Sequence, residues 1–483
     1  MRRSILVATL VLLLVGGVIV VAALVAPRPV PRAGDGPGED VPTAPVVAAD
    51  GLGDPYYPQA GNAGYDVLGY DIDLTYEPRT DRLDGITTVT AVATQALRGF
   101  SLDLRLPASA VEVDGAPAAF TQDDGELHVT PAVPVAEGAS MRVLVTYGGI
   151  PSELPSPGGI AAPWTRARGG VAAVGQPEGA SWWFPANDHP SDKATVAVNV
   201  SVPEGVEAIS NGALLGGPEP TPDGRDRWRW RADEPMAPYL AFVVIGQYEL
   251  DRRDTPLGPY VGAYPADASP RVITLLDRTP QVAETLAEIF GPYPFGQLGG
   301  VAAPIRGFAL ENQTRPVYAE SFLDSRQGAS VVVHELAHQW FGDSVALARW
   351  RDIWLNEGFA TYAEWLYDER TGGPPAVDVA RGYYEARPAD DDFWTVPPGD
   401  PGREDLFDRA VYVRGGMAVQ AIRSAVGDED FFAILRAWPT ERRGANGTVE
   451  DFLTLAERIS GEDLDAVARE WLYDADRPPA PPG

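Results

Sequence analysis

The sequence predicts an α+β protein in which an N-terminal all-β domain precedes a mainly helical domain. From about residue 56 to 248, short runs alternate apolar and polar residues, which is the spacing of half-buried antiparallel strands. From about residue 270 onward, apolar residues recur at helical spacing, as in helices that pack on a core. We therefore expect a β sandwich or saddle-like curved sheet over 56–248 and a helical domain over 249–476.

The composition is that of a folded protein with two or three domains. The chain has 483 residues, 45% of them hydrophobic, with 12 Trp, 18 Tyr and 15 Phe, which is more apolar and aromatic surface than a disordered chain carries. Its formal net charge of -30 repels phosphate groups, so we expect no nucleic-acid partner. Lys193 is the only lysine, a scarcity that we interpret as codon bias rather than function.

The N-terminus has the pattern of a membrane signal anchor. A basic start precedes a charge-free apolar run from Ile5 to Ala26, which is long enough to cross a bilayer. We expect residues 1–26 to be a transmembrane helix that holds the body on the extracytoplasmic side, whereas cleavage of this segment would give a secreted protein. Residues 27–55 are rich in Pro, Gly and Ala and predict a tether, and residues 477–483 are a Pro-rich tail.

Particular runs predict the elements of each domain. Strands are predicted where apolar residues occupy every second position, as in Tyr70, Ile72, Leu74, Tyr76 and in Met141, Val143, Val145, Tyr147. Helices are predicted around Val282, Leu286, Ile289, around Met417, Val419, Ile422, Val426, and over 450–459 and 464–473. The change in spacing between the two sets places the domain boundary near residue 248.

The most specific motif lies in the helical domain. His334–Glu335–Leu336–Ala337–His338 has the HExxH spacing, within a segment from Ala329 to Phe341 that predicts a helix. Residues four apart on a helix lie on one face, so both imidazoles can reach one metal ion, while Glu335 points about 100° away toward a water. The chain has no cysteine, so any further protein ligand must be His, Asp or Glu.

A third ligand is predicted further along the chain. Glu357 follows His338 after eighteen intervening residues, in a segment, Trp354–Ala360, that predicts the start of a second helix packed against the first. Two imidazoles and one carboxylate leave a fourth tetrahedral position for water, which is the pattern of a catalytic rather than a structural zinc site. Zinc lowers the pKa of such a water to about 7, and Glu335 is then the candidate general base.

These motifs resemble the M1 family of zinc aminopeptidases, which are gluzincins. The family shares HExxH, eighteen residues and then Glu, found here as His334, Glu335, His338 and Glu357. The flanking segment His338–Gly342 also matches, and the resemblance covers about residues 56–475. It implies a thermolysin-like fold for the catalytic domain at 249–476 and one Zn²⁺ per chain. It also implies hydrolysis of the N-terminal peptide bond by a zinc-activated water with Glu335 as general base.

Two further segments resemble the parts of that family that bind substrate. Phe308–Asn312 is similar to Gly-Ala-Met-Glu-Asn, which implies that Ala309 and Glu311 bind substrate and that Glu311 holds the free α-amine. Gln176–Pro177–Glu178 is similar to Gln-x-Glu, which implies that Glu178 shares the amine and that Gln176 borders the first side-chain pocket. An ammonium held between two carboxylates gains charge-assisted hydrogen bonds of about 1.5–3 kcal/mol each. Peptides with a free N-terminal amine are therefore the expected partners.

A downstream segment implies a residue that stabilises an oxyanion. Tyr412–Val413–Arg414–Gly415 resembles the family's Tyr-x-Lys-Gly, with Arg414 in place of Lys, which makes Tyr412 the candidate. Glu364 lies two helical turns after Glu357 on the same face. It is either a residue that orients a zinc-binding imidazole or a plain surface glutamate.

Three other functions are compatible with parts of this pattern. A gluzincin endopeptidase would have no need of Glu178 and Glu311 and would cleave N-acetylated peptides as readily as free ones. A non-catalytic cell-surface binding module would tolerate loss of Glu335 or Tyr412, and both are present. An epoxide hydrolase would normally use the large helical C-terminal domain of longer family members. The chain ends before such a domain, so we expect a more open cleft that accepts longer peptides.

Overall fold

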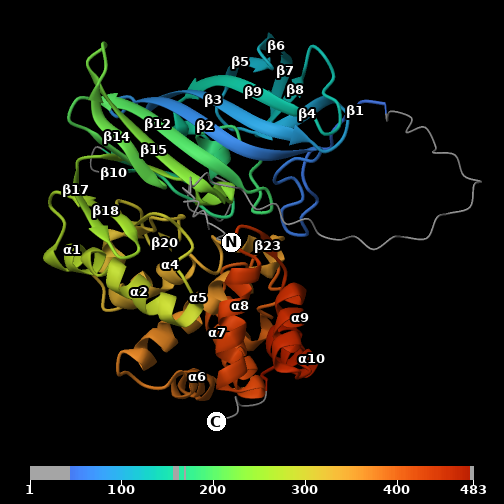
Figure 1. Ribbon diagram of the computed structural model, residues 1–483, viewed down its shortest axis with the longest axis vertical. Coiled ribbons are helices and arrows are strands. Elements are labelled where there is room, and N and C mark those ends of the chain that lie inside the picture. The colour runs from blue at the N-terminus through green and yellow to red at the C-terminus, as the bar shows by residue number, and fades with distance from the viewer. Residues whose placement is uncertain (1–43, 156–162, 168–169, 479–483) are drawn as a thin grey trace, which may run out of the picture. The chain divides into compact units, whose positions relative to one another are not determined.

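The β domain is built on one long sheet. A computed structural model describes residues 44–155, 163–167 and 170–478, and Figure 1 shows this sheet above most of the helices. Its strands follow the order β14-β15-β12-β2-β3-β9-β5-β6, in which β2 and β12 pair in parallel and the other neighbours are antiparallel. The strands are β2 (Tyr65–Glu77), β3 (Arg82–Ala93), β5 (Ala108–Val113), β6 (Ala116–Pro117), β9 (Ser140–Gly149), β12 (Ala194–Pro203), β14 (Ala213–Pro220) and β15 (Arg225–Met236).

Two four-stranded sheets complete this β-rich part. One has the order β1-β4-β8-β7 and the other β10-β11-β16-β13. The alternation predicted for β2 and β9 is confirmed, because their predicted inward residues are all buried. The strands are β1 (Val46–Val47), β4 (Leu97–Asp103), β7 (Ala119–Asp123), β8 (Glu126–Thr130), β10 (Trp164–Ala167), β11 (Gly170–Ala173), β13 (Glu207–Ser210) and β16 (Val243–Gly246).

The C-terminal part begins with a five-stranded sheet of mixed parallel and antiparallel pairs and continues as helices. The sheet has the order β17-β18-β19-β21-β20, and a short pair joins β22 to β23. Its strands are β17 (Tyr248–Thr255), β18 (Gly258–Pro265), β19 (Leu298–Ala303), β20 (Ala309–Leu310), β21 (Val317–Ala319), β22 (Ala346–Leu347) and β23 (Asn446–Gly447). The helices are α1 (Pro270–Asp277), α2 (Thr279–Phe290), α3 (Glu320–Leu323), α4 (Gly328–Ala337), α5 (Trp354–Arg370), α6 (Ala376–Glu385), α7 (Arg409–Val426), α8 (Asp428–Glu441), α9 (Val449–Ser460) and α10 (Asp465–Ala468).

The helical spacing in the sequence predicted α2, α7, α9 and α10, and these predictions are confirmed. The bounds predicted for the motif helix were too long at its C-terminal end, because α4 ends at Ala337 rather than at Phe341. The chain turns there: Asp343 donates its backbone N–H to the carbonyl of His338, and Gly342, at φ 132°, donates to Val345. A side chain at that φ would be strained, so the glycine permits the turn.

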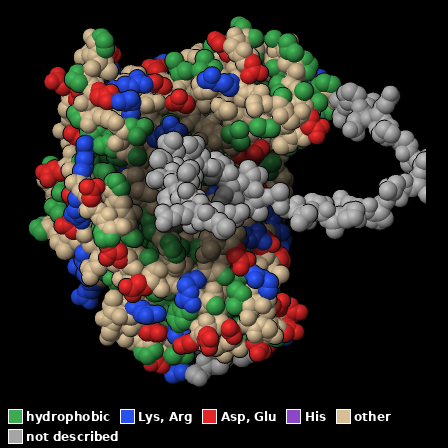
Figure 2. Space-filling view, in the orientation of Figure 1, with side chains coloured by type: hydrophobic (Ala, Val, Ile, Leu, Met, Phe, Trp, Pro, Cys, Tyr) green, Lys and Arg blue, Asp and Glu red, His purple; other side chains and the backbone are tan. Residues whose placement is uncertain are grey.

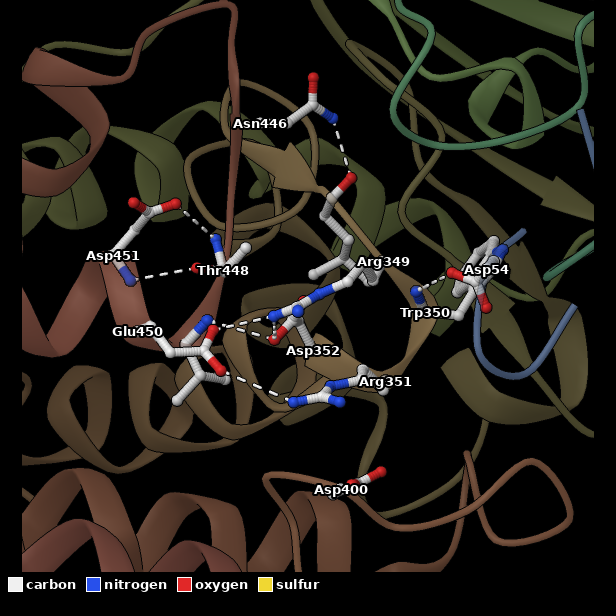
Figure 3. Close-up of polar contacts among 12 residues, drawn as sticks. Asp54, Arg349, Trp350, Arg351, Asp352, Asp400, Asn446, Thr448, Glu450 and Asp451 are labelled. Atoms are coloured by element: carbon white, nitrogen blue, oxygen red, sulfur yellow. Dashed lines mark hydrogen bonds and ion pairs between the residues drawn. The ribbon is translucent and has the colours of Figure 1, made fainter. Parts of the chain in front are cut away.

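The last part of the predicted tether is packed rather than extended. Residues 44–55 contain strand β1, which pairs with β4, and the buried carboxylate of Asp54. Asp54 accepts backbone N–H bonds from Tyr56 and Tyr57. It also accepts the backbone N–H of Trp350, so this segment is fixed to the helical part (Figure 3). The tether prediction is therefore wrong for these residues. The predicted span at 1–26 and the tether up to residue 43 lie outside the described residues.

The same network fixes the start of helix α5. In Figure 3 the guanidinium of Arg349 lies between Asp352 and Glu450, with Nε 2.8 Å from Asp352 Oδ2 and Nη2 2.8 Å from Glu450 Oε2. Asp352 also accepts the backbone N–H of Val449 at the start of α9. These bonds hold the turn that leads into α5, whose first turn carries Glu357. Within 44–155, 163–167 and 170–478, no helix has the length and apolar character needed to span a bilayer.

Candidate zinc centre and substrate site

The predicted metal ligands lie together on two neighbouring helices. Nε2 of His334 is 3.2 Å from Oε2 of Glu357, and Nε2 of His338 is 3.6 Å from the same oxygen. His334 comes from α4, His338 caps the C-terminal end of that helix, and Glu357 lies in α5. The outer nitrogens are also engaged, because Nδ1 of His334 is 2.9 Å from Glu364 and Nδ1 of His338 is 3.0 Å from the carbonyl of Phe341. Both Nε2 atoms are thereby directed at Glu357.

This arrangement fits zinc. Ligand atoms at about 2.0–2.2 Å from a tetrahedral zinc lie about 3.3–3.6 Å apart, close to the two N···O separations observed. The donor set of two imidazoles and one carboxylate is that of catalytic zinc sites, and an imidazole whose other nitrogen is hydrogen bonded is the usual form of such a ligand. Glu364 is thus placed as a partner of His334, the first of the two roles the sequence allowed.

The charges around these ligands are strongly coupled. Burial alone would raise the pKa of Glu357, but the imidazoles of His338 and His334 lower it to about 2. Burial raises the pKa of Glu335 to about 8, although the two histidines oppose the shift. Glu335 lies close to both His338 and Glu311, since ligand atoms of these three residues all fall within 4.8 Å of one another. A buried carboxyl whose pKa is raised in this way is suited to accept and return a proton.

The predicted substrate-binding residues divide into two groups. Glu311 is buried, and its Oε1 accepts hydrogen bonds from Gln176 Nε2 at 3.2 Å and from the hydroxyl of Tyr239 at 2.9 Å. Gln176, Ala309 and Glu311 line one cavity, of about 310 Å³, together with the metal ligands. Glu178 lines a different cavity, where its Oε2 accepts a 2.7 Å ion-pair bond from Arg105. The predicted clamp of two carboxylates is therefore not formed, and the guanidinium of Arg105 is the reason.

Tyr412 lies next to the metal ligands. It lies in the first turn of α7 and lines the cavity of the metal ligands. Its ring stacks on that of His334, with 5.9 Å between the centroids. Burial and the carboxylates of Glu357 and Glu311 raise the pKa of this phenol well above its ordinary value, so the hydroxyl keeps its proton. It is therefore available as a hydrogen-bond donor in the cavity, beside the metal ligands.

Sequence reasoning missed two residues that hold Glu311. Tyr239, in the turn before β16, donates to its carboxylate, and Gln339 Nε2 donates to its backbone carbonyl at 3.0 Å. Gln339 follows the HExxH motif directly and was visible as part of a matching flank, but only the fold shows its contact. No periodicity or motif distinguishes Tyr239 from the other tyrosines of the chain.

A zinc-type HExxH site on two helices, next to a β domain, defines a metallopeptidase. The chain belongs to peptidase family M1, because residues 276–471 match the peptidase family M1 domain and residues 68–240 match the peptidase M1 N-terminal domain. Family membership and the donor set imply one catalytic zinc ion per chain. The fold class predicted from the sequence, a β domain followed by a helical catalytic domain, is confirmed by the same matches.

Known relatives agree with this assignment. The chain is 28% identical over 325 residues to aminopeptidase N of Streptomyces lividans and 28% identical over 328 residues to aminopeptidase M1 of Arabidopsis thaliana. These alignments cover 60% and 61% of this chain but only 36% of either relative. The chain therefore spans about a third of the length of the curated relatives it matches.

Solved structures match over a larger share. The crystal structure of an M1 zinc metallopeptidase from Deinococcus radiodurans is 31% identical, with a TM-score of 0.82, and covers 90% of this chain and 99% of that one. A mutant of that protein bound to a Tyr-Ser-Ala substrate is 30% identical, with the same TM-score, and the match covers 100% of its chain.

Proposed function

We propose that the protein is a zinc aminopeptidase that removes single residues from the N-terminus of peptides. The observation that supports this most directly is the position of Glu311 next to the metal ligands. An oxygen of Glu311 lies within 4.8 Å of a ligand nitrogen of His338. In a peptide the α-nitrogen is only about 2.5 Å from the first carbonyl carbon. An α-ammonium bound by Glu311 therefore brings the first peptide bond, and no later one, to the metal centre.

The residues of the chain divide the chemistry between them. His334, His338 and Glu357 would hold the zinc ion, which when bound supplies a Lewis acid that polarises a carbonyl and lowers the pKa of a water. Glu335 accepts the proton of the attacking water and returns it to the leaving amine. Tyr412 donates a hydrogen bond to the carbonyl oxygen as negative charge develops there, which favours the transition state over the ground state.

A free amine is recognised by a different set of contacts from the predicted one. Glu311 supplies the carboxylate, while Gln176 from the β domain and Tyr239 orient it. Burial raises the pKa of Glu311, as does the charge of Glu357, whereas the imidazole of His338 lowers it. An arriving ammonium compensates that buried carboxylate, whereas an N-acetylated peptide would leave it unpaired.

The experiment is hydrolysis of amino-acid aminocoumarin amides, free and N-acetylated, by purified residues 44–483 with and without zinc. We expect zinc-dependent cleavage of the free-amine series alone, and a loss of about 10²–10⁴-fold in kcat for Glu335→Gln with zinc still bound. Glu320→Gln, outside the metal ligands, is the matched control. Equal cleavage of acetylated substrates would identify an endopeptidase, and no cleavage by the zinc-loaded protein would identify a binding module.

We also propose that the catalytic body works outside the cytoplasm, anchored by residues 1–26. Support comes from the apolar run between Ile5 and Ala26 and from the basic residues before it. The test is fractionation of cells that express the full chain or a form without residues 1–26. The full chain should stay with membranes after a high-salt wash and be cleaved by protease added to intact spheroplasts. Recovery of the full chain in the cytoplasmic fraction would contradict the proposal.

A further inference from the structure

The only lysine of the chain connects the β domain to the zinc centre. Lys193 lies directly before β12, and its Nζ donates to the backbone carbonyls of Asp343 and Ser344, at 2.7 and 2.9 Å. Burial lowers the pKa of this amine to about 8, while the nearby Asp343 carboxyl raises it. Removing a cation from water costs free energy, and the hydrogen bonds that Lys193 donates to two carbonyls of the other domain offset that cost.

The turn that Lys193 contacts is the one that orients a metal ligand. It consists of residues 341–345 and follows the end of α4. The carbonyl of Phe341 accepts the Nδ1 proton of His338, and the backbone N–H of Asp343 donates to the carbonyl of His338 at 3.0 Å. Displacement of the turn would therefore rotate the imidazole of His338 relative to Glu357.

The same turn also contacts the residues that bind the amine. Oδ2 of Asp343 accepts from Gln339 Nε2 at 2.7 Å, and that amide also donates to the carbonyl of Glu311. Asp343 is fully buried and its Oδ1 has no hydrogen-bond partner. Burial and the charge of Glu311 raise the pKa of the Asp343 carboxyl, and the charge of Lys193 opposes this. The cation thus acts on the turn in two ways, through the bonds it donates to the carbonyls of Asp343 and Ser344 and through its charge near the Asp343 carboxyl.

We propose that Lys193 is a positioning residue for the zinc centre. Through the turn at 341–345 it fixes His338 for the metal and, through Asp343 and Gln339, it fixes Glu311 for the substrate. The second effect depends on the proposed aminopeptidase function, whereas the first concerns zinc binding alone. Lysine is scarce in the chain, which we interpreted above as codon bias. Position 193 is the exception, and the two hydrogen bonds of Lys193 give a structural reason for it.

The test compares zinc affinity in three variants by competition with a chromophoric chelator. Lys193→Met removes both hydrogen bonds and should weaken zinc binding by about 10–100-fold, the usual effect of losing a partner that orients a ligand. Lys193→Arg keeps a cation with two donors and should restore most of the affinity. Arg231→Met is the control, because Arg231 lies opposite Ala197 of β12 and, among the described residues, its side chain pairs with the exposed Asp233.

Kinetics with saturating zinc then test the contact with Glu311. We expect Lys193→Met to have a higher KM for free-amine substrates, and we expect this increase to remain in the presence of excess zinc. If Lys193→Met fails to fold, Lys193→Gln, which can donate to one carbonyl, should show an intermediate zinc affinity. Zinc affinity equal to that of Arg231→Met in a folded variant would overturn the proposal, as would a fall in melting temperature that is the same with and without zinc. Normal zinc binding by the wild-type protein without any peptidase activity would instead contradict the proposed function and leave the role of Lys193 in zinc binding intact.

Discussion

The zinc-binding and the amine-binding halves of the site are assembled in different ways. All three metal ligands come from α4, its C-terminal cap and α5, two neighbouring helices joined by a short segment. The amine-binding half combines Glu311 after β20 with Gln176 of the β domain and Tyr239. The first half follows from helix geometry and a fixed spacing, whereas the second exists only because two domains pack together. Figure 2 shows acidic and basic side chains interspersed over the visible face of both parts.

The largest effect is expected in the zinc half. Glu357→Gln removes the only anionic ligand of three, and about a third of a zinc binding energy of roughly 10–16 kcal/mol is about 4 kcal/mol, or a thousandfold in affinity. Glu364→Gln, on the same helix, only changes the partner of His334 and should cost about 10–100-fold. Chelator competition on both variants measures the difference. A larger loss for Glu364→Gln than for Glu357→Gln would mean that Glu364, rather than Glu357, completes the ligand set.

The sequence was sufficient for the zinc half. Helical periodicity places His334 and His338 on one face, and the spacing to Glu357 needs only the next helix. The β domain was also predictable as a class, because apolar alternation reports which face of a strand is buried, as at Tyr70 and Ile72. What periodicity does not report is which strands become neighbours. The parallel pairing of β2 with β12, between segments far apart in the chain, had no local signal.

The sequence was not sufficient for the amine half. Glu178 was predicted at the site from its position in a motif, but its carboxylate pairs with Arg105. That guanidinium comes from a segment 73 residues earlier in the chain, whose backbone bonds to residues of the 181–186 segment bring it near. Tyr239 was missed for the converse reason, because a tyrosine becomes a partner of Glu311 through burial and direction rather than residue type. Ion pairs and single hydrogen bonds between distant segments depend on tertiary contacts that a single sequence does not encode locally.

The next prediction concerns the segment that supports Tyr412. Arg414 is fully buried and donates to the carbonyls of Trp394, Glu470, Trp471 and Asp474, so it ties the end of the chain to α7. Arg414→Met would leave several buried carbonyls without donors and should lower the free energy of unfolding by about 3 kcal/mol. Urea unfolding measures this, with the exposed Arg409→Met as control. A loss no larger than that of the control would show that water replaces the guanidinium.

The amine half gives a smaller and more selective effect. Glu311→Gln keeps the shape of the side chain but removes its charge, which should cost about 2 kcal/mol for free-amine substrates, or about thirtyfold in kcat/KM. Glu178→Gln should change kcat/KM much less, because the structure places its carboxylate on Arg105. The aminocoumarin series measures both variants. If Glu178→Gln were as damaging as Glu311→Gln, the two-carboxylate clamp of the original prediction would form when substrate binds.

The smallest effect tests how the packed N-terminal segment is fixed to the helical part. Burial would raise the pKa of Asp54, but hydrogen bonds from His189 and from three backbone N–H groups lower it to about 2 from 3.8. The native carboxylate therefore stabilises the fold at pH values above about 4, and this contribution is lost as pH falls through about 2. At 1.36 kcal/mol per pKa unit the contribution is about 2 kcal/mol at most.

Asp54→Asn should lower the free energy of unfolding by about 1–2 kcal/mol at pH 7, and the difference from wild type should shrink below pH 4. Urea unfolding at pH 7, 4 and 3, with the exposed Asp390→Asn as control, measures it. A difference that stayed constant down to pH 3 would assign the effect to side-chain shape and hydrogen bonding, and the negative charge of Asp54 would then have no part in holding the segment to the body.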